Sequence, residues 1–344
     1  MISLLIINFR TAALARDAVR SARATTSTPL QVVIVDNSCD AREAGALRGE
    51  ADILIVPETN RGYAGGINAG RPACSGSTIV VSNPDVTFGP QALDRLAQSL
   101  GPDVAVSGPA LFWDDAHEWW LPPGDLNTAP EKVDEILAGR STAWREQRDL
   151  RRFQKRVAFW SNRKSVAVRM LSGAVLAIRA EDLDAAGGFD ERFALYFEEA
   201  DFLRRISERR KRIVYVPAAR CRHIYNQSSA QTGSVAAERY AQSELLYLEK
   251  WNGPWLARAL KGMERPLAAR DAPALQGPLV LDHLEVVIEV SPLPSFTTAA
   301  GHFPSSLTID VPREVRESAG NAPLFLRVVE REPARVLATY KLTP

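Results

Sequence analysis

Residues 32–38 read Val-Val-Ile-Val-Asp-Asn-Ser, a run of four β-branched residues that ends abruptly in three polar ones. Three other short apolar runs, at residues 4–7, 53–56 and 78–81, are also followed by polar or turn-forming residues, and helix-like stretches lie between the runs. Such runs are typical of strands that are buried on both faces of a parallel sheet. We therefore predict an α/β fold with an open, mostly parallel, Rossmann-like sheet.

The polar residues after these runs are the first place to look for a binding site. Sheets of this kind bind ligands beyond the carboxyl ends of their strands. A carboxylate such as Asp36 can accept hydrogen bonds from ribose hydroxyls or a base edge there, although a turn or helix cap explains an aspartate at this point equally well. The candidate residues at this edge are Asn8, Arg10, Asp36, Asn37, Asn83 and Asp85.

Composition narrows the class of protein. The 344 residues carry 42 Lys and Arg against 41 Asp and Glu, so the formal charge of +1 argues against a nucleic-acid partner. Three cysteines without metal-site spacing fit a reducing compartment. The chain has no run of about 18 apolar residues and its first residues do not resemble a signal peptide. We expect a cytoplasmic protein, with peripheral contact to the inner face of a membrane as one option.

Composition shifts along the chain divide it into three parts. Residues 1–234 hold the α/β pattern, residues 235–271 read as a helical extension and linker, and residues 272–344 alternate as a small all-β module. Within the first part, residues 140–169 carry ten Lys or Arg and apolar residues at helical spacing. This basic helix can lie on anionic lipid or pack on the main domain, and the β module can serve oligomerisation.

A glycine-rich segment and two isolated residues add candidates. The segment Asn60-Arg-Gly-Tyr-Ala-Gly-Gly-Ile-Asn-Ala-Gly70 permits close backbone approach and opens a helix whose N-terminus can face a phosphate. Asp85 follows a strand and offers the oxygen ligand that Mg²⁺ or Mn²⁺ prefers, but a Pro-Asp turn reads the same way. His223 can complete a metal site or be a structural histidine.

Three carboxylates, Glu198, Glu199 and Asp201, stand close together in Tyr196-Phe-Glu-Glu-Ala-Asp-Phe-Leu-Arg204. Helix capping alone accounts for acidic residues at a helix start. Crowded carboxylates also raise one another's pKa, toward values that suit a general base. The cluster is therefore the strongest candidate for catalysis.

Together the segments resemble the family 2 glycosyltransferases of GT-A fold, and among them bacterial rhamnosyltransferase-like enzymes. The resemblance covers roughly residues 1–250, in the family's order. The matching segments are Ile6-Ile-Asn-Phe9, Ile34-Val-Asp-Asn-Ser38, Asn60-Arg-Gly-Tyr-Ala-Gly-Gly-Ile-Asn68, Ser82-Asn-Pro-Asp-Val86, Ser172-Gly-Ala174, Gly187-Gly-Phe-Asp-Glu191, Tyr196-Phe-Glu-Glu-Ala-Asp201 and His223.

The resemblance implies roles for these residues. Asp85 would be the last residue of a metal-binding Asp-x-Asp triplet and His223 a further metal or diphosphate contact, with Mg²⁺ or Mn²⁺ as cofactor. Glu199 would be the catalytic base, with Glu198 and Asp201 as reserves. Asn83 and Glu199 both depart from the family's pattern, which has Asp at each position. The implied nucleotide-sugar contacts are Asn8, Arg10, Asp36, Asn37, Arg61, Gly62, Gly65, Gly66, Asn68, Asn83 and Gly173.

The implied function is that of an inverting enzyme. It would move L-rhamnose from dTDP-rhamnose to a hydroxyl of a glycan or of a lipid-linked saccharide. The alternative is a catalytically degenerate sugar-nucleotide-binding or scaffold protein of a polysaccharide assembly complex, which Asn83 and Glu199 favour. A sugar nucleotidyltransferase is disfavoured because no glycine-rich Arg/Lys loop follows the first strand.

Overall fold

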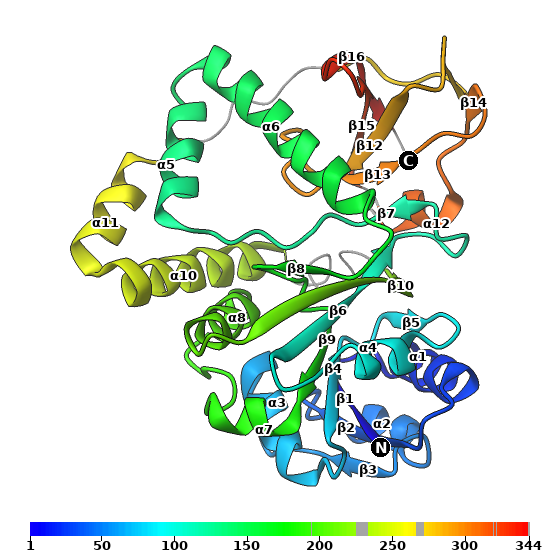
Figure 1. Cartoon of the computed structure of the whole chain (residues 1–344), viewed down its shortest axis with the longest axis vertical. Coiled ribbons are helices and arrows are strands. Elements are labelled where there is room, and N and C mark those ends of the chain that lie inside the picture. Colours follow the sequence, from blue (N-terminus) through cyan, green and yellow to red (C-terminus); the bar gives the residue numbers. More distant parts are fainter. Residues whose placement is uncertain (194, 225–232, 266–271, 319, 321, 343–344) are drawn as a thin grey trace.

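A computed structural model describes residues 1–193, 195–224, 233–265, 272–318, 320 and 322–342. Its main sheet has 14 strands and runs through the whole height of the molecule (Figure 1). Residues 1–100 form the lower part of that view, and the C-terminal strands form the upper part.

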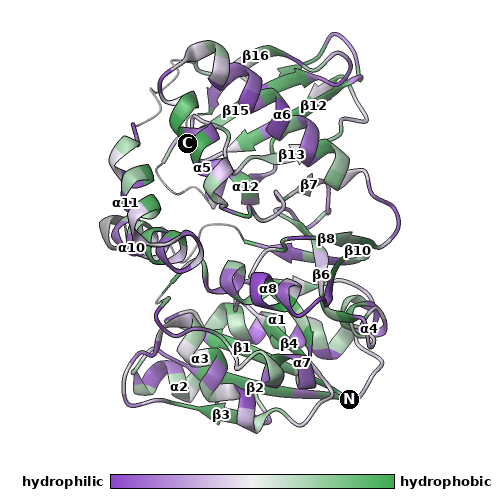
Figure 2. Cartoon of the chain, turned by 60° about the vertical axis from the view of Figure 1, so that its left-hand side comes forward, coloured by the Kyte–Doolittle hydropathy of each residue, from purple (hydrophilic) through white to green (hydrophobic). Residues whose placement is uncertain are grey.

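The parallel core of the sheet is formed by the predicted apolar runs. Four strands lie side by side in the order β3-β2-β1-β4, and each neighbouring pair is parallel. Their bounds are β1 Ile2–Asn8, β2 Leu30–Asp36, β3 Ile53–Ile55 and β4 Thr78–Ser82. Figure 2 shows these strands as largely hydrophobic. The prediction of an α/β fold with a parallel core is confirmed.

Helices cover both faces of this core because alternate residues of each strand point to opposite sides. Leu4 and Ile6 of β1 pack with apolar residues of α1 (Ala12–Thr25) on one face. Leu5 and Ile7 pack with α3 (Gly62–Gly70) on the other. The remaining short elements of this half are α2 Ala41–Leu47, η1 Arg71–Ala73, α4 Ala92–Gln98 and α7 Ala180–Ala185.

Beyond β4 the sheet becomes mixed. β9 (Val175–Arg179) is antiparallel to β4, and β6 (Val104–Phe112) follows it in the sheet. The long strand β10 (Arg212–His223) is parallel to β6 and pairs with β5 (Val86–Phe88) and β8 (Val166–Val168). Residues 170–174, which precede β9, are irregular.

The C-terminal strands continue the main sheet. β7 (Trp119–Trp120) pairs with β13 (Ala300–His302), which joins the order β16-β15-β12-β13 to the core. The other strands are β12 Val286–Ser291, β15 Leu324–Glu330 and β16 Arg335–Leu342, with a separate pair β11 Leu279–Val280 and β14 Thr308–Ile309 and the helix α12 Arg313–Glu317. The strand-rich character of this region is as expected, but the short helix α12 departs from an all-β module, and the status of the region as a separate module stays a prediction.

Four further helices lie on the left and upper left of the view in Figure 1. They are α5 Ala129–Ala138, α6 Thr142–Trp160, α10 Gly233–Asn252 and α11 Pro254–Met263. The predicted helical extension is divided into α10 and α11 at Gly253, whose φ of +84° no ordinary helix residue adopts. Residues 266–271 of the predicted linker lie outside the described residues.

The apolar face of α6, the predicted basic helix, is packed inside the protein. Phe153 and Trp160 are each 1% exposed and contact Val287 of β12 and Val329 of β15. That face is therefore not available to a membrane. No helix among the described residues is long and apolar enough to cross a bilayer.

Candidate active site

Asn8 and Asp36 meet at the carboxyl ends of β1 and β2, where the strand register places them opposite each other. The Asn8 amide nitrogen donates to Asp36 Oδ1 at 3.0 Å and so fixes the carboxylate. Asp36 Oδ2 is buried and has no hydrogen-bond partner within the described part of the chain. Buried polar atoms normally have partners, so this oxygen is a candidate acceptor for a ligand hydroxyl or N–H.

Arg10 and Asn37 frame this edge. Arg10 has a φ of +57°, and its backbone N–H donates to Ser38 Oγ at 2.7 Å. Its exposed guanidinium lies 5.3 Å from the ring centre of Phe9. The Asn37 side chain spans to the glycine-rich segment, where its Nδ2 donates to the Gly62 carbonyl at 2.8 Å. The predicted nucleotide edge and the glycine-rich segment are therefore directly connected.

The glycines of α3 serve the packing of this helix more than ligand approach. A Cβ added to Gly66 would lie 2.8 Å from Ile7 Cγ2 and 3.1 Å from Asn37 Nδ2. At Gly65 the nearest atom, at 3.0 Å, would be Arg61 Cβ. Arg61 itself is exposed and pairs with Glu191 at 3.4 Å. The absence of a Cβ at Gly66 therefore allows α3 to pack closely on the sheet.

The Asn68 side chain forms its hydrogen bonds with the turn that contains Gly187-Gly-Phe-Asp190. Its Nδ2 donates to the Phe189 carbonyl at 2.8 Å and to Glu191 at 2.9 Å, while its Oδ1 accepts from the Phe189 N–H at 2.9 Å. The side chain holds the turn in place, and in this arrangement its NH₂ group already makes two hydrogen bonds within the protein. The sequence could not distinguish a structural role of Asn68 from contact with a nucleotide sugar, because a side-chain amide suits both.

Asp85 and His223 come together although they are 138 residues apart. β5 and β10 pair so that His223 lies opposite Val86, next to Asp85. His223 Nε2 is 3.3 Å from Asp85 Oδ1 and 3.5 Å from Asn83 Nδ2. Asp85 is 6% exposed, and its Oδ1 accepts no hydrogen bond from the described residues. This predicted pair therefore converges at the carboxyl end of β4.

Glu198 and Glu199 begin α8 (Glu198–Glu208) on the same side of the molecule as Asp85. The segment at residues 173–174 makes the connection. Gly173 lies against Glu199, and the Ala174 carbonyl accepts from the Asn83 N–H at 2.9 Å, two residues before Asp85. The Tyr63 hydroxyl donates to the Gly173 carbonyl at 3.3 Å. The base side and the Asp85 side therefore meet at this segment, with the Tyr63 hydroxyl beside it.

Burial governs the acid–base behaviour of this group. Burial raises the pKa of Glu198, and the neighbouring Glu199 carboxylate raises it further. Burial also raises the pKa of Glu199. Burial likewise raises the pKa of Tyr63 well above its ordinary value, and the nearby carboxylates reinforce that shift. Each glutamate also has a buried Oε2 to which no described group donates. A raised carboxyl pKa and an unpartnered oxygen are what a general base requires.

Gly173 leaves the space that Glu199 fills. A Cβ at this position would lie 3.1 Å from Glu199 Cγ and 3.3 Å from its Cδ. The residue was expected to contact the nucleotide sugar, and its observed neighbour is the candidate base. Tyr63 was not among the expected site residues, although it is the one aromatic residue of the glycine-rich segment.

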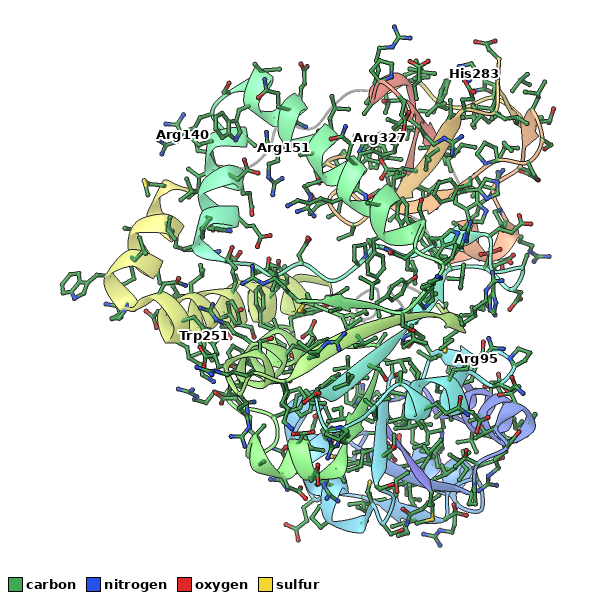
Figure 3. All side chains as sticks on the ribbon, in the orientation of Figure 1. Arg95, Arg140, Arg151, Trp251, His283 and Arg327 are labelled. Carbon is green, nitrogen blue, oxygen red and sulfur yellow. The ribbon has the colours of Figure 1, made fainter. Side chains whose placement is uncertain are left out.

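Asp201 does not belong to this group. It is fully buried, and its carboxylate accepts from Arg205 at 2.8 Å and from Trp251 Nε1 at 3.0 Å, with Lys250 Nζ at 2.6 Å. Trp251 reaches it from α10 (Figure 3). These partners satisfy both oxygens, so Asp201 links α8 to α10 and is unsuited to the reserve role expected for it.

The residues present fit a divalent ion with help from a substrate. Asp85 and His223 offer one oxygen and one nitrogen ligand that face each other. Nowhere in the described ranges do three or more His, Cys, Asp or Glu residues form a cluster that holds a metal. Mg²⁺ is commonly bound by one or two carboxylates together with substrate phosphates and water. The remaining ligands would therefore come from a diphosphate.

Comparison with known proteins identifies the class. The sequence model of the glycosyltransferase-like family 2 matches residues 1–239. The chain belongs to this family and is a glycosyltransferase, and its α/β core is the GT-A architecture that the motifs imply.

Individual relatives are more distant. An N-acetylglucosaminyl-diphospho-decaprenol L-rhamnosyltransferase of Mycobacterium tuberculosis is 26% identical over 276 residues, which are 71% of this chain and 83% of the relative, in both strains compared. Two solved structures are similar at low identity. The mannosyltransferase PcManGT from Pyrobaculum calidifontis, in complex with GDP-Man and Mn²⁺, has a TM-score of 0.47 and 14% identity over 76% of this chain and 73% of that one. GalNAc-T7 with UDP, GalNAc and Mn²⁺ has a TM-score of 0.48 and 13% identity over 65% and 44%.

Proposed function

We propose that this glycosyltransferase moves L-rhamnose, with inversion, from dTDP-rhamnose to a hydroxyl of a lipid-linked saccharide in the synthesis of a cell-envelope polysaccharide. The observation that carries the proposal is the segment at residues 173–174, which brings the diphosphate side and the base side to one place. Gly173 lies against Glu199, and the Ala174 carbonyl accepts from the Asn83 N–H at 2.9 Å, two residues before Asp85. The choice of donor and acceptor draws on the Mycobacterium relative, which is named for this reaction type.

The residues divide the work of a direct displacement. Asp36, fixed by Asn8, receives the nucleoside, and the diphosphate lies toward Asp85 and His223. Glu199 takes the proton from the acceptor hydroxyl as the new oxygen–carbon bond forms and the bond from the anomeric carbon to the diphosphate breaks. Attack opposite the leaving group inverts the anomeric centre, and no covalent enzyme intermediate is needed.

Asp85 and His223 would hold the Mg²⁺ or Mn²⁺ ion. When bound, it supplies positive charge to the departing nucleoside diphosphate. Glu199 is preferred to Glu198 as the base because Glu199 is the more exposed of the two, whereas Glu198 is 6% exposed. A hydroxyl of the acceptor reaches Glu199 more readily.

A second candidate is a degenerate family member that binds sugar nucleotides without transferring sugar. Asn83 removes one charge from the metal triplet, and Glu199 stands where the family has Asp. In favour of an active enzyme, Asn83 lies 3.5 Å from His223, so the substituted residue still faces the pair that would hold the metal. Release of dTDP from dTDP-rhamnose distinguishes the two candidates, because a pure binding protein releases none.

Location and assembly remain predictions. A cytoplasmic enzyme would meet dTDP-rhamnose directly, and contact with the inner membrane face would bring it to a lipid-linked acceptor. The proposed membrane contact through residues 140–169 loses the buried apolar face of α6. It would therefore rest on exposed residues of that segment such as Trp144, Arg151 and Lys155. Oligomerisation through residues 272–344 is likewise a proposal.

The test is a calorimetric screen of nucleotide sugars with and without Mn²⁺, followed by transfer to an N-acetylglucosaminyl-diphospho-lipid. We expect binding selective for dTDP-rhamnose, strengthened by Mn²⁺, and a rhamnosylated lipid product. Selective binding of another nucleotide sugar contradicts the donor. Transfer to free glycans at the same rate as to the lipid-linked saccharide contradicts the acceptor.

A further inference from the structure

A cavity of about 300 Å³ lies beside the active site and is used by none of the steps above. Its walls come from α6, from the loop over residues 122–126 that follows β7, and from residues 168–170 ahead of β9. None of the residues at the nucleotide edge or around Asp85 lines it. The cavity is therefore separate from the donor site.

The chain itself joins the cavity to the base. Met170 lines the cavity, and Gly173, three residues later, lies against Glu199. Three residues span at most about 11 Å. Gly124 of the opposite wall is packed against the same segment, since a Cβ there would lie 2.8 Å from the Leu171 carbonyl oxygen. A single extended ligand can therefore occupy the cavity and also reach Glu199.

Positive charge predominates in the lining. Four cations line the cavity, namely Arg152, Lys155, Arg156 and Arg169, against the two carboxylates of Asp125 and Glu131. Arg152 pairs with Asp125 at 2.7 Å. Lys155 and Arg169 are exposed and form no ion pair with any residue that the structure describes.

Arg156, a buried residue of the lining, adds positive charge. It contacts Glu289, but Arg327 shares the same carboxylate, so two guanidiniums face one anion. Burial lowers the pKa of Arg156 despite Glu289, and the Arg327 and Arg152 guanidiniums lower it further. The lining accordingly has a surplus of positive charge that an anionic ligand would neutralise.

The rest of the wall is apolar. Pro122, Leu126, Phe159 and Met170 line the same cavity as the cations. A free nucleotide or inorganic phosphate gains nothing from such a wall. A diphosphate esterified to a hydrocarbon chain matches both halves of the lining, because its charge meets Lys155 and Arg169 while its first carbons meet the apolar side chains.

We propose that this cavity binds the diphosphate of the acceptor and the start of its prenyl chain, with Lys155 and Arg169 as the phosphate contacts. The assignment rests on the proposed function, in which the acceptor is a saccharide linked to a lipid by a diphosphate. It places the acceptor sugar between the cavity and Glu199, on the side opposite to the nucleotide.

The direct test is calorimetric titration of the full-length protein with geranyl diphosphate, a short prenyl diphosphate. Saturating dTDP occupies the donor site so that the probe reports only on the cavity. We expect the wild type to bind the probe more tightly than inorganic pyrophosphate. Lys155→Ala and Arg169→Ala should each weaken binding by about tenfold or more, since each removes a charge-assisted contact. Lys155→Arg should retain binding.

The control is Lys164→Ala combined with Arg209→Ala, which removes the same charge from exposed positions outside the lining. Equal loss in this variant, unchanged binding after Lys155→Ala with Arg169→Ala, or no binding by the wild type would each overturn the assignment. The readout needs no sugar transfer. If the probe binds through Lys155 and Arg169 while dTDP-rhamnose is not a substrate, the cavity assignment stands and the proposed reaction fails.

Discussion

Glu199 and Asp201 lie two residues apart on α8, and the helix turns them about 200° away from each other. Glu199 is left beside Gly173 with an unpartnered oxygen, whereas Asp201 is enclosed by Arg205, Lys250 and Trp251. Glu199→Gln keeps the shape and removes the base. We expect it to lower the transfer rate by about 10²–10⁴-fold while the calorimetric affinity for the donor is unchanged.

Asp201→Asn is the matched control for Glu199→Gln. It should lower the free energy of unfolding by about 1–3 kcal/mol, because Arg205 and Lys250 lose a charged partner, while donor binding persists. Urea denaturation measures this change. Near-normal transfer by Glu199→Gln would move the base to Glu198.

The contribution of Glu198 to the free energy of unfolding depends on pH. Burial and then the Glu199 carboxylate raise the pKa of Glu198 in the fold above its unfolded value of about 4.3. Its contribution to stability is fully present below that value and is lost as the pH rises through the raised pKa.

Glu198→Gln should therefore raise the melting temperature at pH 8, corresponding to roughly 1–3 kcal/mol, and the gain should vanish near pH 4. Circular dichroism melts at the two pH values measure this. A variant less stable than the wild type at pH 8 would mean that the carboxylate is stabilised by a cation in the folded protein.

At the scale of elements, the approach of α3 to β1 depends on Gly66. Ala at this position meets Ile7 Cγ2 at 2.8 Å, and overpacking of this kind costs about 1–3 kcal/mol. Gly66→Ala should lower the free energy of unfolding by that amount in urea denaturation, and should weaken donor binding because Asn37 is displaced. Gly45→Ala in α2 is the control. It has nothing within 4 Å of the added Cβ and should stabilise the protein by about 0.5–1 kcal/mol.

The turn before α8 could not be predicted from sequence. Tyr196 and Phe197 both have a φ of +68°, a conformation that bulky residues rarely adopt. Packing of Phe197 against Tyr240 and Tyr247, with ring centres 5.2 and 5.5 Å apart, accompanies this backbone. Strained residues of this kind gather at functional sites, and here the turn aims Glu198 and Glu199. The acidic cluster was visible in the sequence, but its direction depends on contacts with α10.

The core strands were predictable for a simple physical reason. A strand buried on both faces needs a continuous apolar run, and residues 4–7, 32–35 and 78–81 supply one. The meeting of Asp85 with His223 follows from the register of β5 with β10, which no local pattern encodes. Asn68 was assigned to the nucleotide sugar and Asp201 to a reserve catalytic role, because polar residues near a site look alike until their partners are known.

At the scale of the whole molecule, the pairing of β7 with β13 joins regions that the sequence separates. β7 has only two residues, Trp119 and Trp120, so no strand pattern marks it. Helix α6 crosses from the first part of the chain onto the C-terminal strands, where Phe153 and Trp160 are buried. The division at residue 272 stays a prediction, and these contacts give a way to test it.

The ion group of Arg156, Glu289 and Arg327 connects α6 to β12 and β15, and all three side chains are at most 5% exposed. Arg327 lies close to α6 in the view of Figure 3. Glu289→Gln leaves two buried guanidiniums without their shared anion. Removing one partner of a buried ion pair costs about 3–5 kcal/mol, so the variant should unfold at a clearly lower temperature.

The form of that transition tests the domain division. If residues 272–344 unfold together with the core, calorimetry of Glu289→Gln shows one transition shifted as a whole, as the continuous sheet leads us to expect. Two transitions, of which only the smaller moves, would establish an independent C-terminal domain. Glu330→Gln on the same strand group is the control. Its pairing with Arg335 is partly exposed, and its loss should change stability by no more than about 1 kcal/mol.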